Sequence, residues 1–169
     1  MSALPLSGVR VVDLTRILSG PFCAMILGDL GAEVTKIETP GRGDPVRGHG
    51  HVRDGLSWYF AGFNRNKRSV ALDLRTPEGR GVLERLLAEA DILTENFRPG
   101  VLDEMGLTAE RLAGINPDLI VASVHGYGST GPYADRPAFD FIAQAMSGYM
   151  STNGTADTGP LRTAPPLTD

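Results

Sequence analysis

Short β-competent runs alternate with helical segments along most of this sequence. Apolar or amphipathic helices, or signals for helix starts, separate the β-competent runs, which cover residues 9–14, 33–38, 69–74, 91–97 and 119–124. Parallel strands need a long crossover connection, usually a helix, so this alternation is typical of a parallel sheet wrapped by helices. The sequence therefore predicts an α/β fold with a Rossmann-like parallel sheet flanked by helices.

The first strand–helix–strand unit spans Val9 to Glu38. Ser19 or Gly20 can cap a helix that begins at Pro21, because proline suits the first helical position. Gly31 then suits the position just after the helix. The turn before the helix lacks the G-x-G-x-x-G pattern, so the sequence does not predict a dinucleotide site.

Polar, basic or aromatic residues stand at the carboxyl ends of four of the predicted strands. In open parallel sheets, ligands bind at the carboxyl ends of the strands. The segments expected at that edge are residues 15–20, 72–75, 96–98 and 125–127. The second of them lies between the cationic stretch 64–68 and a helix start at Thr76-Pro77. This arrangement could bind an anion, and the alternative is a solvated basic turn before an ordinary strand.

Composition excludes several classes of function. A net charge of -4 leaves no excess of cations for general binding to nucleic acid. No apolar run approaches the roughly 18 residues of a transmembrane helix, and no signal-peptide pattern opens the chain. The single cysteine, Cys23, fits a reducing, cytoplasmic setting without disulfides. His49 and His51 lack a third ligand nearby, so no metal site is predicted.

The composition changes near residue 127. Beyond it, residues 138–150 have the character of an apolar helix, and residues 152–166 form a linker rich in Gly, Pro and Thr. We therefore expect residues 1–127 to form most of a Rossmann-like domain. Residues 128–169 are expected to begin the connection to a second domain.

These motifs together resemble the family III CoA-transferases, a superfamily that includes formyl-CoA transferase, carnitine CoA-transferases and α-methylacyl-CoA racemase. The blocks that carry the resemblance are Asp13-Leu14-Thr15, Leu30-Gly31-Ala32-Glu33-Val34, Asn64-x-Asn66-Lys67-Arg68-Ser69, Glu95-Asn96-Phe97-Arg98-Pro99-Gly100 and Gln144-Ala145-x-Ser147-Gly148. Members of the family are more than twice as long and form interlocked homodimers. The resemblance therefore implies an N-terminal segment only, with an incomplete form of that dimeric fold.

The resemblance implies an enzyme that moves CoA from an acyl-CoA to a carboxylic acid acceptor. Asp169 falls on the family's nucleophile, whose carboxylate forms an aspartyl anhydride and then an aspartyl-CoA thioester. CoA would be a substrate, with no tightly bound cofactor. Without the resemblance, Asp169 would be an ordinary residue of a flexible tail. A truncated, non-catalytic CoA-binding remnant is the alternative from another class.

The CoA contacts of the family carry over to five segments of this chain. The implied binding residues are Arg16, Ile17, Leu18, Ser19, Leu72, Arg75, Asn96, Phe97, Arg98, Met105, Ala138 and Phe139. Arg75 and Arg98 would face phosphate groups, while Leu72 and Phe97 would frame the adenine or the pantetheine. Glu104 and Thr39 stand where relatives often carry a cation, and Arg42 could compensate for that difference.

An acyl-CoA racemase of the same superfamily is a further alternative. The racemases need a His/Asp pair to move an α-proton, with the histidine directly before the aspartate of the Gln-containing helix. In this chain, Phe139 stands before Asp140, and His125 belongs to a different motif. The sequence therefore favours a transferase over a racemase.

Overall fold

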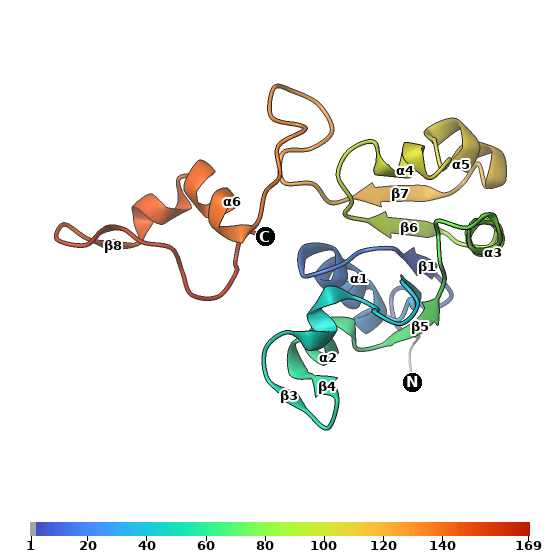
Figure 1. The fold of residues 1–169 in the computed structure, drawn as a ribbon, viewed down its shortest axis with the longest axis horizontal. Coiled ribbons are helices and arrows are strands. Elements are labelled where there is room, and N and C mark those ends of the chain that lie inside the picture. The colour runs from blue at the N-terminus through green and yellow to red at the C-terminus, as the bar shows by residue number, and fades with distance from the viewer. Residues whose placement is uncertain (1–2) are drawn as a thin grey trace. The chain divides into compact units, whose positions relative to one another are not determined.

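The computed structural model describes residues 3–169, which form two compact units, residues 3–124 and His125–Asp169 (Figure 1). Residues 1 and 2, where the predicted first domain begins, lie outside the described residues. The division falls directly after the last strand of the main sheet, so that sheet belongs entirely to the first unit.

The described part of the first unit contains a five-stranded parallel sheet with the order β5-β2-β1-β6-β7. The strands are β1 (Arg10–Asp13), β2 (Glu33–Glu38), β5 (Lys67–Ala71), β6 (Ile92–Glu95) and β7 (Ile120–Ser123). Along the chain, this order is 3-2-1-4-5, so the winding direction reverses between β1 and β6. Such a reversal opens a crevice at the carboxyl ends of the strands. The predicted Rossmann-like parallel sheet is confirmed.

Helices cover both faces of this sheet. They are α1 (Ser19–Asp29), α2 (Trp58–Asn64), α3 (Pro77–Leu87), α4 (Val101–Glu104) and α5 (Ala109–Ile115). Successive residues of a strand point to opposite faces. Val11 accordingly belongs to an apolar cluster with Ala24 of α1, whereas Val12 belongs to a second cluster with Leu83 of α3 and Leu112 of α5. The two clusters form the core of the unit.

Local sequence signals explain the start of α3 but not that of α1. The Thr76 hydroxyl accepts a hydrogen bond from the Gly79 N–H, and Pro77 begins the helix as predicted. Gly79 is required because a Cβ there would lie 2.1 Å from the Asp73 carbonyl oxygen. The predicted cap of α1 is wrong: the helix begins at Ser19, after Leu18, and no side chain caps it.

The strand predicted over residues 69–74 lies two to three residues earlier, at Lys67–Ala71. The Lys67 ammonium is buried against the Asp13 carboxylate, 2.9 Å away, and this pair draws the cationic stretch into the sheet. The chain leaves the sheet at Leu72 and turns through Asp73 toward α3. Within the cationic stretch 64–68, Asn64 ends α2, residues 65 and 66 form a turn, and Lys67 and Arg68 begin β5.

The segment of residues 40–64 contains several short elements. They are the 3₁₀ helix η1 (Pro45–Gly48), the hairpin strands β3 (Val52–Arg53) and β4 (Leu56–Ser57), and α2. The Ser57 hydroxyl caps α2 by accepting from the Phe60 N–H, 3.0 Å away. The short helix α2 packs against α1, and the rings of Phe22 and Phe63 meet edge to face.

The apolar side chains of β7 are only partly covered within the first unit. Ile120 is 61% exposed and Val121 is 41% exposed. β7 is an edge strand that pairs with β6, which explains its exposure. The first unit therefore leaves apolar side chains of β7 exposed.

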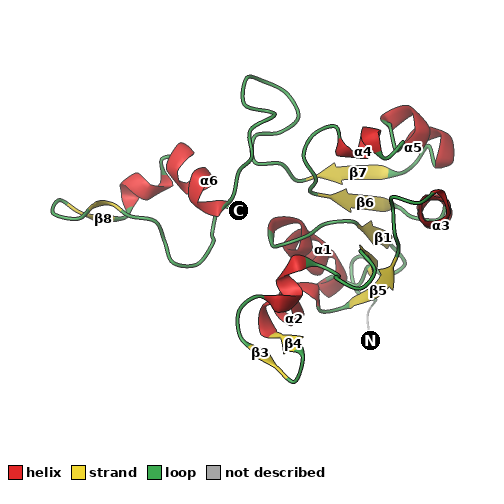
Figure 2. Cartoon of the chain, in the orientation of Figure 1, coloured by secondary structure: helices red, strands yellow, loops and turns green. Residues whose placement is uncertain are grey.

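The second unit is mostly irregular chain (Figure 2). It contains α6 (Asp140–Met146), the 3₁₀ helix η2 (Tyr149–Thr152) and the hairpin strands β8 (Gly154–Thr155) and β9 (Gly159–Pro160). The predicted helix over residues 138–150 is shorter because Gly148 turns to a φ of 78°. In the described chain, no helix is long and apolar enough to cross a membrane.

Candidate functional site

A cavity of about 240 Å³ lies in the first unit at the carboxyl ends of β1, β2, β5 and β6. Its lining residues come from the end of β2, from the segments that follow these strands and from the end of α4: Leu14, Thr15, Arg16, Lys36, Ile37, Glu38, Thr39, Gly43, Asp44, Leu72, Asp73, Leu74, Arg75, Phe97 and Met105. The position is the one that the reversal of strand order predicts for a ligand.

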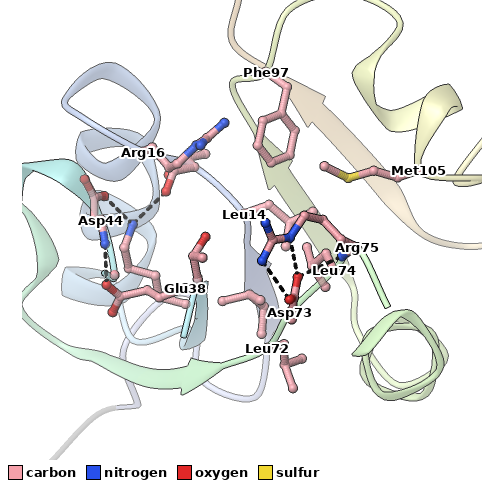
Figure 3. Close-up of a pocket in the computed structure, with 15 residues that line it drawn as sticks. Leu14, Arg16, Glu38, Asp44, Leu72, Asp73, Leu74, Arg75, Phe97 and Met105 are labelled. Atoms are coloured by element: carbon pink, nitrogen blue, oxygen red, sulfur yellow. Dashed lines mark hydrogen bonds and ion pairs between the residues drawn. The ribbon is translucent and has the colours of Figure 1, made fainter. Parts of the chain in front are cut away.

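The cavity brings together residues that the sequence analysis singled out from four separate segments. They are Arg16, Leu72, Arg75, Phe97 and Met105. In Figure 3, Glu38 and Asp44 lie at one end of the cavity and Met105 and Arg75 at the other. The cavity thus combines apolar walls with charged groups, as a site for an amphipathic ligand requires.

The turn after β1 presents Arg16 beside an aromatic ring. The Asn96 side chain fixes the turn, since its Oδ1 accepts from the Arg16 N–H at 2.8 Å and its Nδ2 donates to the Arg16 carbonyl at 2.7 Å. The Arg16 guanidinium lies 4.9 Å from the centroid of the Phe97 ring, within the range of a cation–π contact. Asn96 therefore shapes the site by holding Arg16.

Arg75 folds back onto a neighbouring carboxylate. Its Nε and Nη2 each lie 2.8 Å from an oxygen of Asp73, in a bidentate pair (Figure 3). Hydrogen bonds from the Arg75 side chain and backbone hold the pKa of Asp73 down at about 2. A phosphate that approached Arg75 would have to share it with Asp73 or displace that carboxylate.

The other predicted CoA-binding residues do not line this cavity. Ile17, Leu18 and Ser19 continue from the turn into α1, and Leu18 is buried. Arg98 is exposed, beyond the end of β6. Ala138 and Phe139 belong to the second unit, where Phe139 is the residue before α6.

Three charged cavity residues were not predicted from the sequence: Lys36, Glu38 and Asp44. The Lys36 Nζ lies 3.0 Å from the Asp44 carboxylate and donates to the Thr15 carbonyl at 2.7 Å. Burial opposes ionisation of Glu38, but hydrogen bonds from Arg47, Ser69 and the Asp44 N–H outweigh it and lower the pKa of Glu38 to about 2. The polar end of the cavity is therefore a network of paired charges.

A second buried ion pair lies below the same turn. The Asp13 carboxylate accepts from the Lys67 ammonium at 2.9 Å, and it also accepts from the N–H of Thr15 at 2.9 Å. Lys67 further donates to the carbonyl of Pro21 and to Asn64. Burial lowers the pKa of Lys67 although Asp13 opposes that shift. The asparagine–lysine block of the sequence thus supports the turn from inside the sheet.

Asp169 lies in the second unit, next to residues that Asp140 holds. The Asp140 carboxylate accepts from the Thr168 N–H at 2.9 Å and from the Gln144 side chain at 2.6 Å. Partial burial and the charge of Asp140 raise the pKa of Asp169, and a hydrogen bond from the Asp140 backbone partly offsets this. The segment before Asp169 is anchored further by Gln144, which accepts from the Thr163 N–H at 2.9 Å.

Comparison with known proteins identifies the family. The model described as CoA-transferase family III matches residues 6–169. The chain belongs to this family. Among the curated members, it is 47% identical over 159 residues to the succinyl-CoA–D-citramalate CoA-transferase of Chloroflexus aurantiacus, covering 94% of this chain and 40% of that protein. It is 49% identical over 158 residues to the acetyl-CoA:oxalate CoA-transferase of Acetobacter aceti, covering 94% and 41%.

Solved structures show the same family likeness. A CAIB/BAIF family protein from Brucella suis superposes with a TM-score of 0.92 at 45% identity, covering 98% of this chain and 45% of that one. A hypothetical protein from Mycobacterium tuberculosis superposes with a TM-score of 0.87 at 38% identity, covering 98% and 46%. The chain therefore spans about two fifths of the length of the curated family members.

One sequence signal could have revealed the charged network. Lys36 and Glu38 are separated by one residue in β2, so both side chains point to the same face at the carboxyl end of a mostly buried strand. Charged residues in that position are buried only when they are paired.

Among residues 3–169, no three His, Cys, Asp or Glu side chains are grouped so that they could hold a metal ion.

Proposed function

We propose that this chain is the CoA-binding part of an enzyme that transfers CoA between carboxylic acids, with Asp169 as its nucleophile. The observation that carries the proposal is the cavity at the switch point of the sheet, around which Arg16, Leu72, Phe97 and Met105 converge. Family membership and the transferase names of the curated relatives support the same reaction class.

The cavity would enclose one end of CoA. Its volume of about 240 Å³ is smaller than the roughly 300–1,000 Å³ of pockets for drug-sized ligands. The adenine ring would lie between the Phe97 ring and the apolar side chains of Leu72 and Met105. Arg16, already beside Phe97, would face a phosphate group. The rest of CoA would extend out of the cavity.

Asp169 would carry out the covalent chemistry. Its carboxylate attacks the thioester carbonyl of the donor, which forms an acyl–aspartyl anhydride and releases the CoA thiolate. The thiolate attacks the aspartyl carbonyl, which frees the donor acid and leaves an aspartyl-CoA thioester. The acceptor carboxylate attacks that thioester to form a second anhydride and releases the thiolate again. The thiolate then attacks the acceptor's acyl carbonyl, and Asp169 is regenerated.

The acceptor would be a short dicarboxylic acid. The names of the curated relatives include citramalate, glutarate and oxalate, each of which carries two carboxyl groups. A racemase has no comparable support, because Phe139 occupies the position of the histidine that an α-proton transfer would need. We further propose a homodimer in the cytoplasm, on the basis of the family resemblance and the lone cysteine.

An exchange assay tests the proposed function. In the intact protein, we expect succinyl-CoA and glutarate to yield glutaryl-CoA, measured by mass spectrometry. Asp169→Ala should reduce this exchange by at least about a thousandfold, since removal of a covalent nucleophile leaves no route through the enzyme-bound intermediates. Hydroxylamine should trap an acylated form of the wild-type protein at Asp169.

Asp157→Ala provides the matched control, because Asp157 is an exposed aspartate of the same unit. It should exchange CoA like the wild type. Full activity of Asp169→Ala would refute the proposal that Asp169 is the nucleophile. Incorporation of deuterium at the α-carbon of an acyl-CoA, without exchange between acids, would instead indicate a racemase. CoA binding without either reaction would indicate the non-catalytic remnant.

A further inference from the structure

The turn after β1 contains a residue in a disfavoured conformation. Ile17 has a φ of 73°, in the left-handed region. That region is costly for residues with a side chain, and most of all for β-branched ones such as isoleucine. A conformation of this kind persists only when the surrounding structure imposes it, and such sites are enriched where a protein binds its ligands.

Side chains from elsewhere in the first unit impose this turn. Asp44 accepts from the Ile17 N–H at 3.3 Å, and Lys36 donates to the Thr15 carbonyl at 2.7 Å. Asn96 holds both the N–H and the carbonyl of Arg16. The backbone on either side of Arg16 is thus fixed by groups that come from β2, from the segment after it and from the end of β6.

Lys36 and Asp44 are the most deeply buried of these anchors. Their side chains are 1% and 0% exposed, and their charged atoms lie 3.0 Å apart. A buried ion pair is seldom better for stability than apolar residues of the same volume, because both charges lose their hydration. Stability alone therefore does not account for the Lys36–Asp44 pair, whereas a specific backbone geometry that the pair maintains does.

That geometry is the presentation of Arg16 at the cavity. The turn that Lys36 and Asp44 hold carries the Arg16 guanidinium to within 4.9 Å of the Phe97 ring centroid. We propose that Lys36 and Asp44 are positioning residues for CoA binding, which hold Ile17 in its left-handed conformation so that Arg16 faces the ligand. This inference rests on the proposed binding of CoA in the cavity.

The test removes the pair without leaving an unpaired charge. We expect the double variant Lys36→Met/Asp44→Leu of the intact protein to weaken CoA binding about tenfold, the factor that corresponds to the cost of a left-handed non-glycine residue. Calorimetric titration gives the Kd for CoA. In the exchange assay, KM for the acyl-CoA should rise by a similar factor, with kcat within about twofold of the wild type.

Glycine at position 17 distinguishes positioning from packing. Glycine adopts positive φ about as readily as negative φ. Ile17→Gly in the background of the double variant should therefore recover part of the lost affinity, whereas a loss of packing would not be relieved by a more flexible turn. The control is Glu84→Leu/Arg111→Met, which removes an ion pair between α3 and α5 with the same change in charge. Its Kd should match the wild type.

Three outcomes decide the inference. An unchanged Kd for CoA in the double variant would overturn the inference. A raised Kd that Ile17→Gly does not lower again would also overturn it. Phe97→Ala separates it from the proposed function: if Phe97→Ala also leaves the Kd unchanged, the CoA site itself is wrong. If Lys36→Met/Asp44→Leu does not fold, Lys36→Met/Asp44→Asn keeps an acceptor for the Val46 N–H, and the same recovery by glycine is expected.

Discussion

Glu38 shows how a single buried carboxylate organises the polar end of the cavity. Arg47 donates to both of its oxygens, at 2.7 and 2.6 Å, and the Ser69 hydroxyl donates at 2.6 Å. The N–H of Asp44 adds a bond at 2.8 Å. Each of these bonds favours the ionised form, so Glu38 links the segment that carries Asp44 to the ends of β2 and β5.

This pairing predicts an acid-dependent loss of stability. The pKa of Glu38 is about 2 in the folded protein, whereas the ordinary value for a glutamate, taken for the unfolded chain, is 4.5. A lowered pKa contributes stability that is complete above pH 4.5 and is lost as the pH falls toward 2, by about 3 kcal/mol in total. Denaturant unfolding of the wild type and of Glu38→Gln at several pH values should show this component only in the wild type.

Glu84→Gln is the matched control for that measurement. Glu84 also pairs with an arginine, Arg111, but that ion pair is partly exposed to solvent and is therefore worth little. Its removal should change the pH dependence far less than the removal of Glu38. Equal slopes for the wild type and Glu38→Gln between pH 4.5 and 2 would show that Glu38 is not held in its ionised form.

Some residues that line the cavity can be predicted from the sequence, whereas others cannot, for a physical reason. Arg16, Leu72 and Phe97 lie within three residues of a strand end and Met105 directly follows α4, so local pattern and family resemblance were enough to single them out. The burial of Lys36 could not be predicted in the same way. It depends on Asp44, which reaches the lysine only when the segment after β2 folds back over the strand ends.

At the scale of elements, α6 and the segment before Asp169 form one hydrogen-bonded assembly. Asp140 opens α6, accepts from Gln144 one turn later and also accepts from the Thr168 N–H. The Thr168 hydroxyl donates to the Asp140 carbonyl at 3.1 Å. The helix start therefore fixes the residue directly before Asp169, and it places a second negative charge near that carboxylate.

This arrangement predicts a shift in the pH dependence of acyl-enzyme formation. Burial and the Asp140 charge raise the pKa of Asp169, so the carboxylate form that the proposed mechanism requires is lost at a higher pH than for an ordinary aspartate. Asp140→Asn removes the charge, which should lower the pKa of Asp169 and move the acidic limb of kcat/KM to lower pH. Stopped-flow measurement of thioester cleavage across pH gives that limb.

Asp157→Asn serves as the control, since it removes an exposed charge from the same unit without contact to α6 in the hydrogen bonds described. An acidic limb that stays in place in Asp140→Asn, or moves to higher pH, would show that the charge of Asp140 does not act on Asp169 in the proposed reaction. The shift should be partial, because burial is the larger cause of the raised pKa.

Elements with strong local signals were predictable, and those set by distant contacts were not. Thr76 and Pro77 mark the start of α3 within a few residues of sequence, and the structure agrees. The start of β5 depends on the pairing of Lys67 with Asp13, 54 residues apart in the chain. The seven residues of α2 are too few for a helical period to emerge from the sequence.

At the scale of the whole molecule, the fold explains why these residues meet. The order β5-β2-β1-β6-β7 reverses direction between β1 and β6, and the segments after these two strands face each other across the crevice. Arg16 and Phe97 come from those two segments. The cavity is thus a consequence of topology, and the buried charges of Lys36 and Asp44 refine its shape.

A crystal structure of the intact protein with bound CoA tests the central claim most directly. We predict electron density for the adenine end of CoA in the cavity, in contact with Phe97, Leu72 and Met105, and a phosphate group next to Arg16. Ordered CoA at another place on the protein, with this cavity empty, would contradict the account.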